Sequence, residues 1–151
     1  MTSSTVLVLF WYVSRTNVGF LLAKASQRFN ERLAARFTER GFPEVRASYG
    51  SVLVPLFEAG PLRPGDIAAR ARLSKQSMTG LVAQCESAGL VTRERDPDDG
   101  RAYRVSLTRR GRELQAVAEA TLAELDRELV ALLGVRRRDA LVEALKGVME
   151  L

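Results

Sequence analysis

Arginines and aspartates lie close together in one short stretch of the sequence, residues 90–111, which reads LVTRERDPDDGRAYRVSLTRRG. Two arginine-bearing runs flank the loop sequence DPDDG at residues 96–100. Guanidinium groups bind phosphate and carboxylate oxygens in a fixed fork geometry. The stretch could therefore bind a polyanion, provided that the fold places its arginines on one surface. The aspartates at the centre of the stretch need a separate explanation.

The positive charge of the chain is concentrated around this stretch. Residues 62–112 contain 11 lysines and arginines against 6 aspartates and glutamates, which accounts for the whole net charge of +5 of the 151-residue chain. The rest of the chain is neutral overall. Charge gathered in this way indicates a surface that faces a polyanion, whereas helix faces that are merely solvated would carry a balanced distribution.

Several classes of enzyme are excluded by what the sequence lacks. The chain has no histidine and only one cysteine, Cys85, so the commonest general base and the usual zinc ligands are missing. It has neither a phosphate-binding loop nor a glycine-rich dinucleotide turn. We therefore expect no enzyme, no metal and no cofactor. A single cysteine makes no internal disulfide, which favours a reducing, cytoplasmic location.

The longest apolar run, TVLVLFWYV at residues 5–13, is too short to cross a membrane. No basic residue precedes it and no small-residue cleavage site follows it, so it does not resemble a signal peptide. We expect this run to be buried against protein, including a partner chain as one option, and we expect no contact with a membrane.

The spacing of apolar residues predicts helices with a small hairpin between them. Two of the helices are short and joined by a tight turn, as in a helix-turn-helix motif. The outer helices carry more apolar surface than the small central part can cover, which favours pairing with a second copy. The expected helices span residues 18–40, 44–59, 64–71, 74–88, 109–133 and 137–149, and the expected strands span residues 90–95 and 102–108.

The segment LSKQSMTGLVAQCESAGLVTRERDPDDGRAYRVSLTRRGREL resembles the winged helix-turn-helix of MarR-type transcriptional regulators. The matching features are E-x-x-G-L-V at the end of the second short helix, D-P-x-D-x-R in the hairpin loop, and a hydrophobic residue followed by L-T-x-x-G at the start of the long helix. The resemblance is dense over residues 46–113 and consistent in element order elsewhere, although residues 5–13 lie outside the common pattern.

The resemblance implies a mainly α fold with a small β-hairpin wing, in which a winged helix-turn-helix is flanked by N- and C-terminal dimerisation helices. It implies a homodimeric repressor of transcription that binds a pseudo-palindromic operator with half-sites about 10 bp apart. The expected parts are an arm and dimerisation helix (1–45), a DNA-binding domain (46–112) and C-terminal dimerisation helices (113–151). Within the DNA-binding domain, the helix-turn-helix spans about 64–89 and the wing about 90–107.

The start of the second short helix is the expected base-reading surface, because a helix N-terminus presents amide groups and a positive dipole to DNA. Gln76 suits adenine, and Lys75 suits guanine or phosphate. Gly80 departs from the longer polar or basic residue that the family often has there; it removes one contact or allows closer approach. The expected contacts in this helix are Ser74, Lys75, Gln76, Ser77, Thr79 and Gly80.

In the wing, Arg101 is expected to enter the minor groove, whose negative potential attracts arginine. Arg93, Arg95 and Arg104 are expected to contact phosphate or to support the wing. We expect Asp99, two residues before Arg101, to hold the guanidinium of Arg101 at the tip. The aspartates would then orient arginines instead of facing DNA.

Two further residue sets have a structural and a functional interpretation. Cys85 is expected to be a small core residue and not an oxidation sensor. Five aromatic residues could line a pocket for a small-molecule effector between the dimerisation helices and the winged domain, although aromatic residues on helices usually belong to the core. They are Trp11, Tyr12, Phe20, Tyr49 and Phe57.

Two functions remain open on the sequence. The first is a regulator that binds double-stranded DNA as a homodimer and is released by a small molecule of unknown identity. The alternative is a winged-helix module that mediates dimerisation or protein interaction without specific DNA binding. The neutral ends and basic centre of the chain favour the first.

Overall fold

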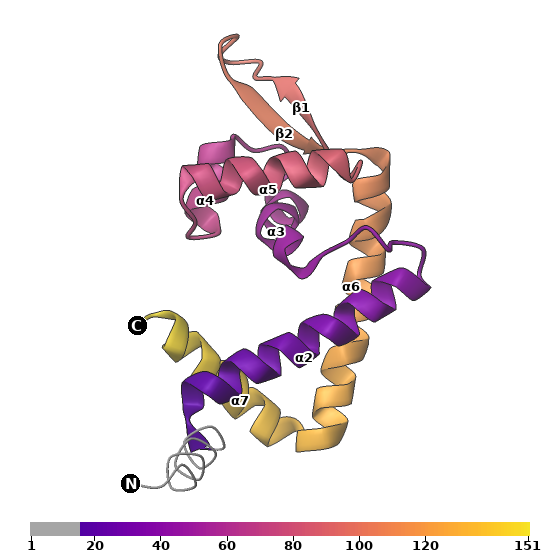
Figure 1. Cartoon of the computed structure of the whole chain (residues 1–151), viewed down its shortest axis with the longest axis vertical. Helices are drawn as coiled ribbons and strands as arrows, with labels where there is room; N and C mark the ends of the chain where they lie inside the picture. Colours follow the sequence, from indigo (N-terminus) through magenta and orange to yellow (C-terminus); the bar gives the residue numbers. More distant parts are fainter. Residues whose placement is uncertain (1–15) are drawn as a thin grey trace, which may run out of the picture.

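The computed structural model describes residues 16–151, so the apolar run at residues 5–13 lies outside the described residues. The described chain forms two parts (Figure 1), which we call the head and the body. The head comprises residues 47–107. The body comprises helix α2 (Val18–Glu39), helix α7 (Val135–Met149) and the C-terminal half of α6 (Arg109–Leu133), the long helix that connects the two parts.

The head begins with a short 3-10 helix, η1 (Ala47–Tyr49), that leads directly into helix α3 (Gly50–Ala59). The sequence pattern placed one helix over residues 44–59, so the regular α-helix starts several residues later than expected. Helix α3 continues through Pro55. Four residues of α3 are buried, which makes it the centre of the head.

The helix-turn-helix consists of α4 (Pro64–Arg70) and α5 (Lys75–Ser87). Pro64 occupies the first turn of α4, where its missing N–H costs nothing. Ser74 caps α5, since its hydroxyl oxygen accepts from the backbone N–H of Ser77 at 3.1 Å. Beyond the end of α5, Gly89 adopts φ 73°, the left-handed conformation that terminates helices. The predicted pair of short helices is present, and each helix ends within one residue of the predicted position.

The wing is an antiparallel hairpin of β1 (Val91–Arg95) and β2 (Tyr103–Leu107), in which Val91 pairs with Leu107 and Arg95 with Tyr103. Leu62, in the turn before α4, forms an isolated bridge to Val105 of β2. Their backbone hydrogen bonds measure 2.8 and 3.2 Å. This bridge was not expected from the sequence, and it ties the base of the wing to the start of the helix-turn-helix.

Helix α6 is attached to the head through its first turn. Thr108 caps it by accepting from the backbone N–H of Gly111 at 3.1 Å, and its hydroxyl donates to the carbonyl of Gly89 at 2.6 Å. A Cβ on Gly111 would lie 2.2 Å from the carbonyl oxygen of Leu90, so only glycine permits this approach. The end of the recognition helix, the base of the wing and the start of α6 therefore form one junction.

In the body, arginines of α2 bind glutamates of α6. Arg36 and Arg40 both donate to Glu124, at 2.9 and 2.5 Å, and Arg36 also reaches Glu128 at 2.5 Å. Arg32 pairs with Glu128 as well. These ion pairs hold the two helices side by side along a face with few buried apolar residues.

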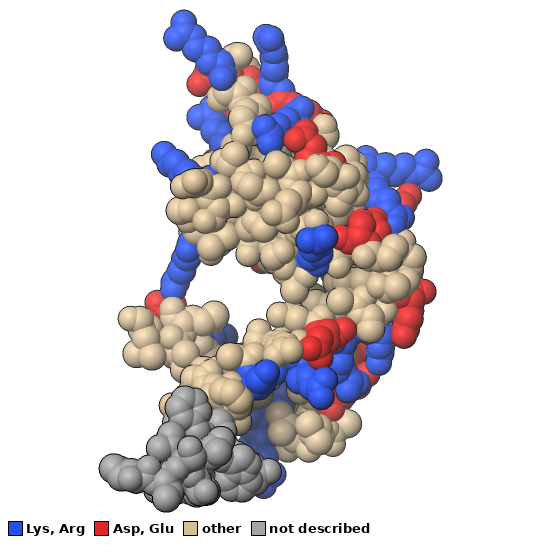
Figure 2. All heavy atoms as spheres, in the orientation of Figure 1, with Lys and Arg blue, Asp and Glu red and all other residues tan. Residues whose placement is uncertain are grey.

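The hydrophobic core lies in the head and in the adjacent parts of α2 and α6. By contrast, no residue of α7 is buried, and the space-filling view shows an opening between the head and the body (Figure 2). Within residues 16–151, no helix is long and apolar enough to cross a membrane. The fully buried large side chains are Leu56, Ile67, Met78, Leu90, Leu114, Val52, Val82, Val91 and Val105.

Candidate nucleic-acid interface

Helix α5 separates an apolar and a polar face. Met78, Val82 and Cys85 are buried against the head. The residues of this helix and its cap that were predicted to contact DNA are all exposed. The exposed set is the complete predicted set, Ser74, Lys75, Gln76, Ser77, Thr79 and Gly80.

Some of these side chains stabilise the helix end as well as being accessible. Ser74 and Ser77 share a hydroxyl hydrogen bond of 2.9 Å, and Thr79 donates to the carbonyl of Lys75 at 2.9 Å. Within residues 16–151, the side chains of Lys75 and Gln76 form no ion pair and no hydrogen bond. Their donors are therefore available to a ligand. A Cβ on Gly80 would meet no atom within 4 Å, so packing does not require glycine there.

The arginines of the wing fall into two groups. Arg93 pairs with Glu86 at 3.1 Å and lies 5.1 Å from the ring centroid of Tyr103, and Arg104 pairs with aspartates of the loop. Arg95 and Arg101 are exposed, and within the described chain neither guanidinium has a partner. Lysines and arginines project around the hairpin at the top of the molecule (Figure 2). Arginines without a partner are available to bind phosphate. The paired arginines stabilise the wing through their ion pairs.

Asp96 is the centre of the wing loop. Its side chain is fully buried and accepts from Arg63 at 2.5 Å and from Arg104 at 3.2 Å. It also accepts from the backbone N–H of Asp98 at 2.9 Å. Arg63, with help from that N–H and from Arg104, holds the pKa of the Asp96 carboxyl well below its usual range. The carboxylate therefore stays charged and connects the loop to β2 and to the turn before α4.

The predicted partner of Asp99 needs correction. Its carboxylate accepts from the backbone N–H of Arg101 at 3.0 Å and does not bind the guanidinium of Arg101. A carboxylate two residues upstream readily closes such a turn onto a backbone amide. Asp99 thus fixes the chain direction at Arg101 and leaves the side chain free. The aspartate that does bind an arginine side chain nearby is Asp98, which accepts from Arg104 at 2.6 Å.

Arg63 was not singled out from the sequence, although it binds the buried Asp96. The only local signal was its place in the proline-rich turn GPLRPG, which indicates a loop and gives no partner. The bridge of Leu62 to β2 brings this turn to the wing. The contact depends on that long-range pairing, which residue spacing alone does not reveal.

The three arginines at the start of α6 have anionic or carbonyl partners, as the unfavourable end of the helix dipole requires. Arg109 pairs with Glu113 at 3.0 Å, and Arg110 pairs with Glu44 at 2.7 Å. Arg112 donates to the carbonyl of Leu107 at 2.8 Å. Their guanidinium groups are thus engaged within the protein.

Cys85 is fully buried, and burial raises the pKa of its thiol to about 12. The thiolate is the reactive form of cysteine, so the buried, protonated thiol is unreactive. Cys85 is therefore a core residue in the native fold, as expected.

The described aromatic candidates for an effector pocket do not gather in one cavity. Phe20 is 43% exposed on α2, and Tyr49 is buried in the core of the head. Phe57 lines a hollow of about 400 Å³ between α3, the wing and the start of α6. Trp11 and Tyr12 lie outside the described residues.

Comparison with known proteins agrees with this geometry. Residues 56–102, from α3 to the tip of the wing, match the model of the MarR family. The chain is 36% identical over 107 residues to the uncharacterized HTH-type transcriptional regulator ML2140 of Mycobacterium leprae, an alignment that covers 71% of this chain and 75% of the relative. The chain belongs to the MarR family. It is accordingly a DNA-binding transcriptional regulator and not an enzyme.

Solved structures of similar proteins share the fold. A probable transcriptional regulator from Pseudomonas aeruginosa is 29% identical with a TM-score of 0.72, covering 89% of this chain and 98% of that one. The transcriptional repressor CouR, solved with a 23-mer DNA duplex, is 25% identical with a TM-score of 0.76, covering 91% and 95%. The expected winged helix-turn-helix fold is confirmed, and one of these similar proteins is bound to DNA.

Proposed function

We propose that this MarR-family protein is a repressor that binds a pseudo-palindromic operator as a homodimer. In this proposal the exposed face of α5 enters the major groove and Arg101 enters the adjacent minor groove. Residues 46–112 form the DNA-binding domain, and residues 1–45 and 113–151 form the dimerisation part. The protein would act in the cytoplasm, where chromosomal DNA is accessible.

The observation that carries the DNA-binding surface is the division of charged side chains by availability. Arg63, Arg93 and Arg104 are paired with acids. Within the described chain, Arg70 of α4 has no partner, and neither do Lys75, Arg95 and Arg101, which we call the free wing and α5 cations. All three belong to the helix or hairpin that a winged helix-turn-helix presents to DNA. Unpaired cations release counterions from DNA without first breaking an internal ion pair.

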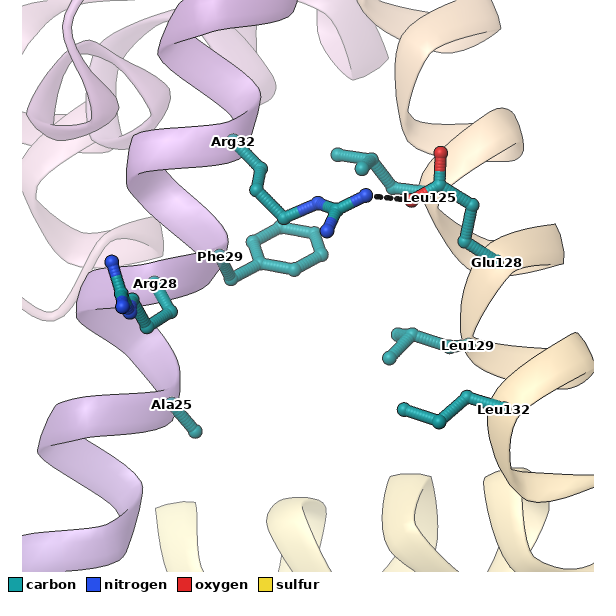
Figure 3. Close-up of a pocket in the computed structure, with 8 residues that line it drawn as sticks. All are labelled: Ala25, Arg28, Phe29, Arg32, Leu125, Glu128, Leu129 and Leu132. Carbon is teal, nitrogen blue, oxygen red and sulfur yellow. Dashed lines mark hydrogen bonds and ion pairs between the residues drawn. The ribbon is translucent and has the colours of Figure 1, made fainter.

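The dimer is supported by apolar surface that the body leaves uncovered. Leu132 is 79% exposed, Val135 62% and Met149 65%. A hollow of about 420 Å³ lies between α2 and α6. In the close-up, Ala25 and Phe29 face Leu129 and Leu132 across this hollow (Figure 3). Exposed apolar surface of this kind is typical of protein interfaces, and a second copy would cover it on both subunits at once.

The repressor role and the effector rest on the family and its members. The similar protein CouR is a repressor. A Streptomyces coelicolor regulator of the same fold, PcaV, was solved with its natural ligand. We propose that a small molecule likewise releases the present protein from DNA. The hollow that Phe57 lines, at the junction of the head with α6, is one place where a ligand would affect the wing.

The proposal is tested with Arg101→Ala and a control of equal charge, Arg137→Ala. Arg137 is exposed on α7, in the body. Binding of each variant to a duplex from the region upstream of the gene is measured by fluorescence anisotropy at several salt concentrations. Loss of a groove contact costs about 1–3 kcal/mol, and loss of a phosphate contact lowers the salt slope by about 1. We expect both effects for Arg101→Ala and neither for Arg137→Ala.

A regulator with this surface binds its upstream duplex in a salt-dependent manner. A wild-type dimer that binds no such duplex, or that binds with no dependence on Arg101, would favour the alternative of an interaction module. The effector is tested by adding candidate small molecules to the same protein–DNA complex. A molecule that releases the DNA lowers the fluorescence anisotropy of the duplex.

A further inference from the structure

Arg72 occupies an unusual backbone conformation at the start of the recognition helix. It lies in the turn between α4 and α5, two residues before the cap residue Ser74. Its φ is 53°, and it is the only residue other than glycine with a positive φ in the described part of the chain. This left-handed conformation favours glycine and disfavours residues with a Cβ. Interactions of the arginine side chain therefore have to offset the conformational cost of this backbone.

The side chain of Arg72 reaches the far end of the body. One guanidinium nitrogen donates to the carbonyl of Met149 at 2.8 Å, and the other donates to the carboxylate of Glu150 at 3.0 Å. Both acceptors lie at the C-terminal end of α7, where the helix dipole is negative and favours a cation. Across residues 16–151, Arg72 makes the only hydrogen bonds between the head and α7.

The position of this contact gives it mechanical importance. The head is attached to the body through α6 on one side, and the end of α7 approaches the head on the other side of the opening (Figures 1 and 2). Without Arg72, the head would be hydrogen-bonded to the body at the α6 side alone. With it, the head is also linked to the body across the opening, through the turn before α5 and the C-terminal end of α7.

We infer that Arg72 is a positioning residue that fixes the recognition helix relative to the body and so sets the operator spacing that the protein accepts. The inference rests on the proposed function, because the body would hold the two heads of a dimer. The distance between two recognition helices must match the half-site spacing on DNA. A head tied on both sides tolerates less variation in that distance than a head tied on one side.

The test compares Arg72→Gly with Arg70→Ala. Arg72→Gly removes the guanidinium and suits the left-handed conformation, so the variant is expected to unfold at the same temperature as the wild type or higher. Arg70→Ala removes the same charge from the neighbouring helix, and Arg70 is exposed without a partner in the described chain. Each protein is titrated with its operator and with duplexes whose half-site spacing is one base pair shorter or longer.

For the wild type we expect a preference for the natural spacing that Arg72→Gly reduces by about two- to five-fold, the range for an exposed ion pair. Arg70→Ala is expected to weaken binding to all duplexes equally. Glu150→Gln provides an independent check, because it changes the residue that Arg72 binds and leaves Arg72 in place. It is expected to reduce the spacing preference in the same direction as Arg72→Gly, by a smaller factor.

An equal effect of Arg72→Gly and Arg70→Ala on every duplex would overturn the inference and assign Arg72 a simple charge effect. An unchanged spacing preference in Glu150→Gln together with a lost one in Arg72→Gly would also overturn it, because the link to α7 would then be irrelevant. Failure of the wild type to bind any duplex contradicts the proposed function, and that result is distinguishable from both.

Discussion

The head and the body are stabilised in different ways. The head is built around fully buried side chains such as Leu56, Ile67 and Met78. In the body, α2 and α6 are joined by arginine–glutamate pairs, and α7 buries no residue. Burial of apolar surface is the main source of stability in a folded chain, whereas exposed ion pairs add little. The head therefore resembles a self-sufficient domain, and the body resembles one half of an interface.

The comparison explains how one small protein combines two requirements. A DNA-reading surface has to keep its shape at any protein concentration, which an internal core provides. A dimer body has to leave apolar surface available for its partner, and its ion pairs keep the helices aligned without covering that surface. Substitutions in the two parts should accordingly differ in whether their effects depend on protein concentration.

The largest effect is expected for Leu56→Ala. Leu56 is 1% exposed at the centre of the head, and truncation of a buried leucine costs about 2–5 kcal/mol. We expect this loss in urea unfolding at every protein concentration. Leu145→Ala serves as the comparison, because Leu145 is 38% exposed on α7. Its loss should be smaller and should vary with protein concentration; a concentration-independent loss of equal size would remove the distinction between head and body.

Leu132→Glu should separate the subunits without unfolding the head. Leu132 is 79% exposed at the end of α6, and burying a leucine at an interface contributes about 1.5–3 kcal/mol. Two copies of the change are present in each dimer. Sedimentation velocity is expected to show monomers at concentrations where the wild type is dimeric. Val54→Glu is the matched control, since Val54 is 46% exposed on the head; dissociation by both variants would contradict the assignment.

Asp96→Asn should change the acid stability of the head. The pKa of Asp96 is lowered in the folded protein, chiefly by Arg63, so its carboxylate stabilises the fold above the pKa of an unfolded aspartate, about 3.9. That contribution is lost as the pH falls below about 4 toward the folded pKa. We expect Asp96→Asn to melt at a lower temperature than the wild type at pH 7. The difference between the two melting temperatures should be smaller at pH 3. A constant difference at both pH values would contradict this.

The smallest effect concerns Asp99. Asp99→Ala removes the acceptor for the backbone N–H of Arg101, and it is expected to weaken DNA binding a few-fold, about 0.5–1.5 kcal/mol for one hydrogen bond, although it also removes a negative charge. Asp99→Asn keeps the side-chain oxygen and removes only the charge, so its affinity should equal or exceed that of the wild type. Tighter binding by Asp99→Ala would show that repulsion of DNA outweighs the turn.

Local patterns were sufficient to predict most elements of this fold. Apolar residues at three- and four-residue steps from Met78 and the cap at Ser74 predicted α5, and the alternation on either side of the aspartates predicted the hairpin. The prediction of one helix over residues 44–59 was wrong at its start, because a 3-10 helix (Ala47–Tyr49) precedes the α-helix that begins at Gly50. Periodicity reports which face is buried, and it does not report how a chain starts a helix.

Contacts between distant residues were beyond the sequence pattern. Asp96 lies in the predicted hairpin loop, but its partner Arg63 lies 33 residues away along the chain. Asp99 was predicted to bind the guanidinium of Arg101, whereas its carboxylate accepts from the nearer backbone N–H of Arg101. This hydrogen bond leaves the arginine side chain free to rotate and so costs less conformational entropy. The residues singled out at the start of α5 are exposed, because the apolar spacing of the helix had already identified Met78, Val82 and Cys85 as its buried face. Their individual contacts with DNA stay predictions.

The burial of Cys85 has a practical consequence for spectroscopy of this protein. The chain contains a single cysteine, and its thiol has a pKa of about 12, so thiol-directed dyes should leave the folded wild type unlabelled. A second cysteine introduced at an exposed site, such as Arg101→Cys at the wing or Glu143→Cys on α7, would then be the one reactive position. Fluorophores or spin labels placed there would report the movement of each part separately, with no need to alter the native core.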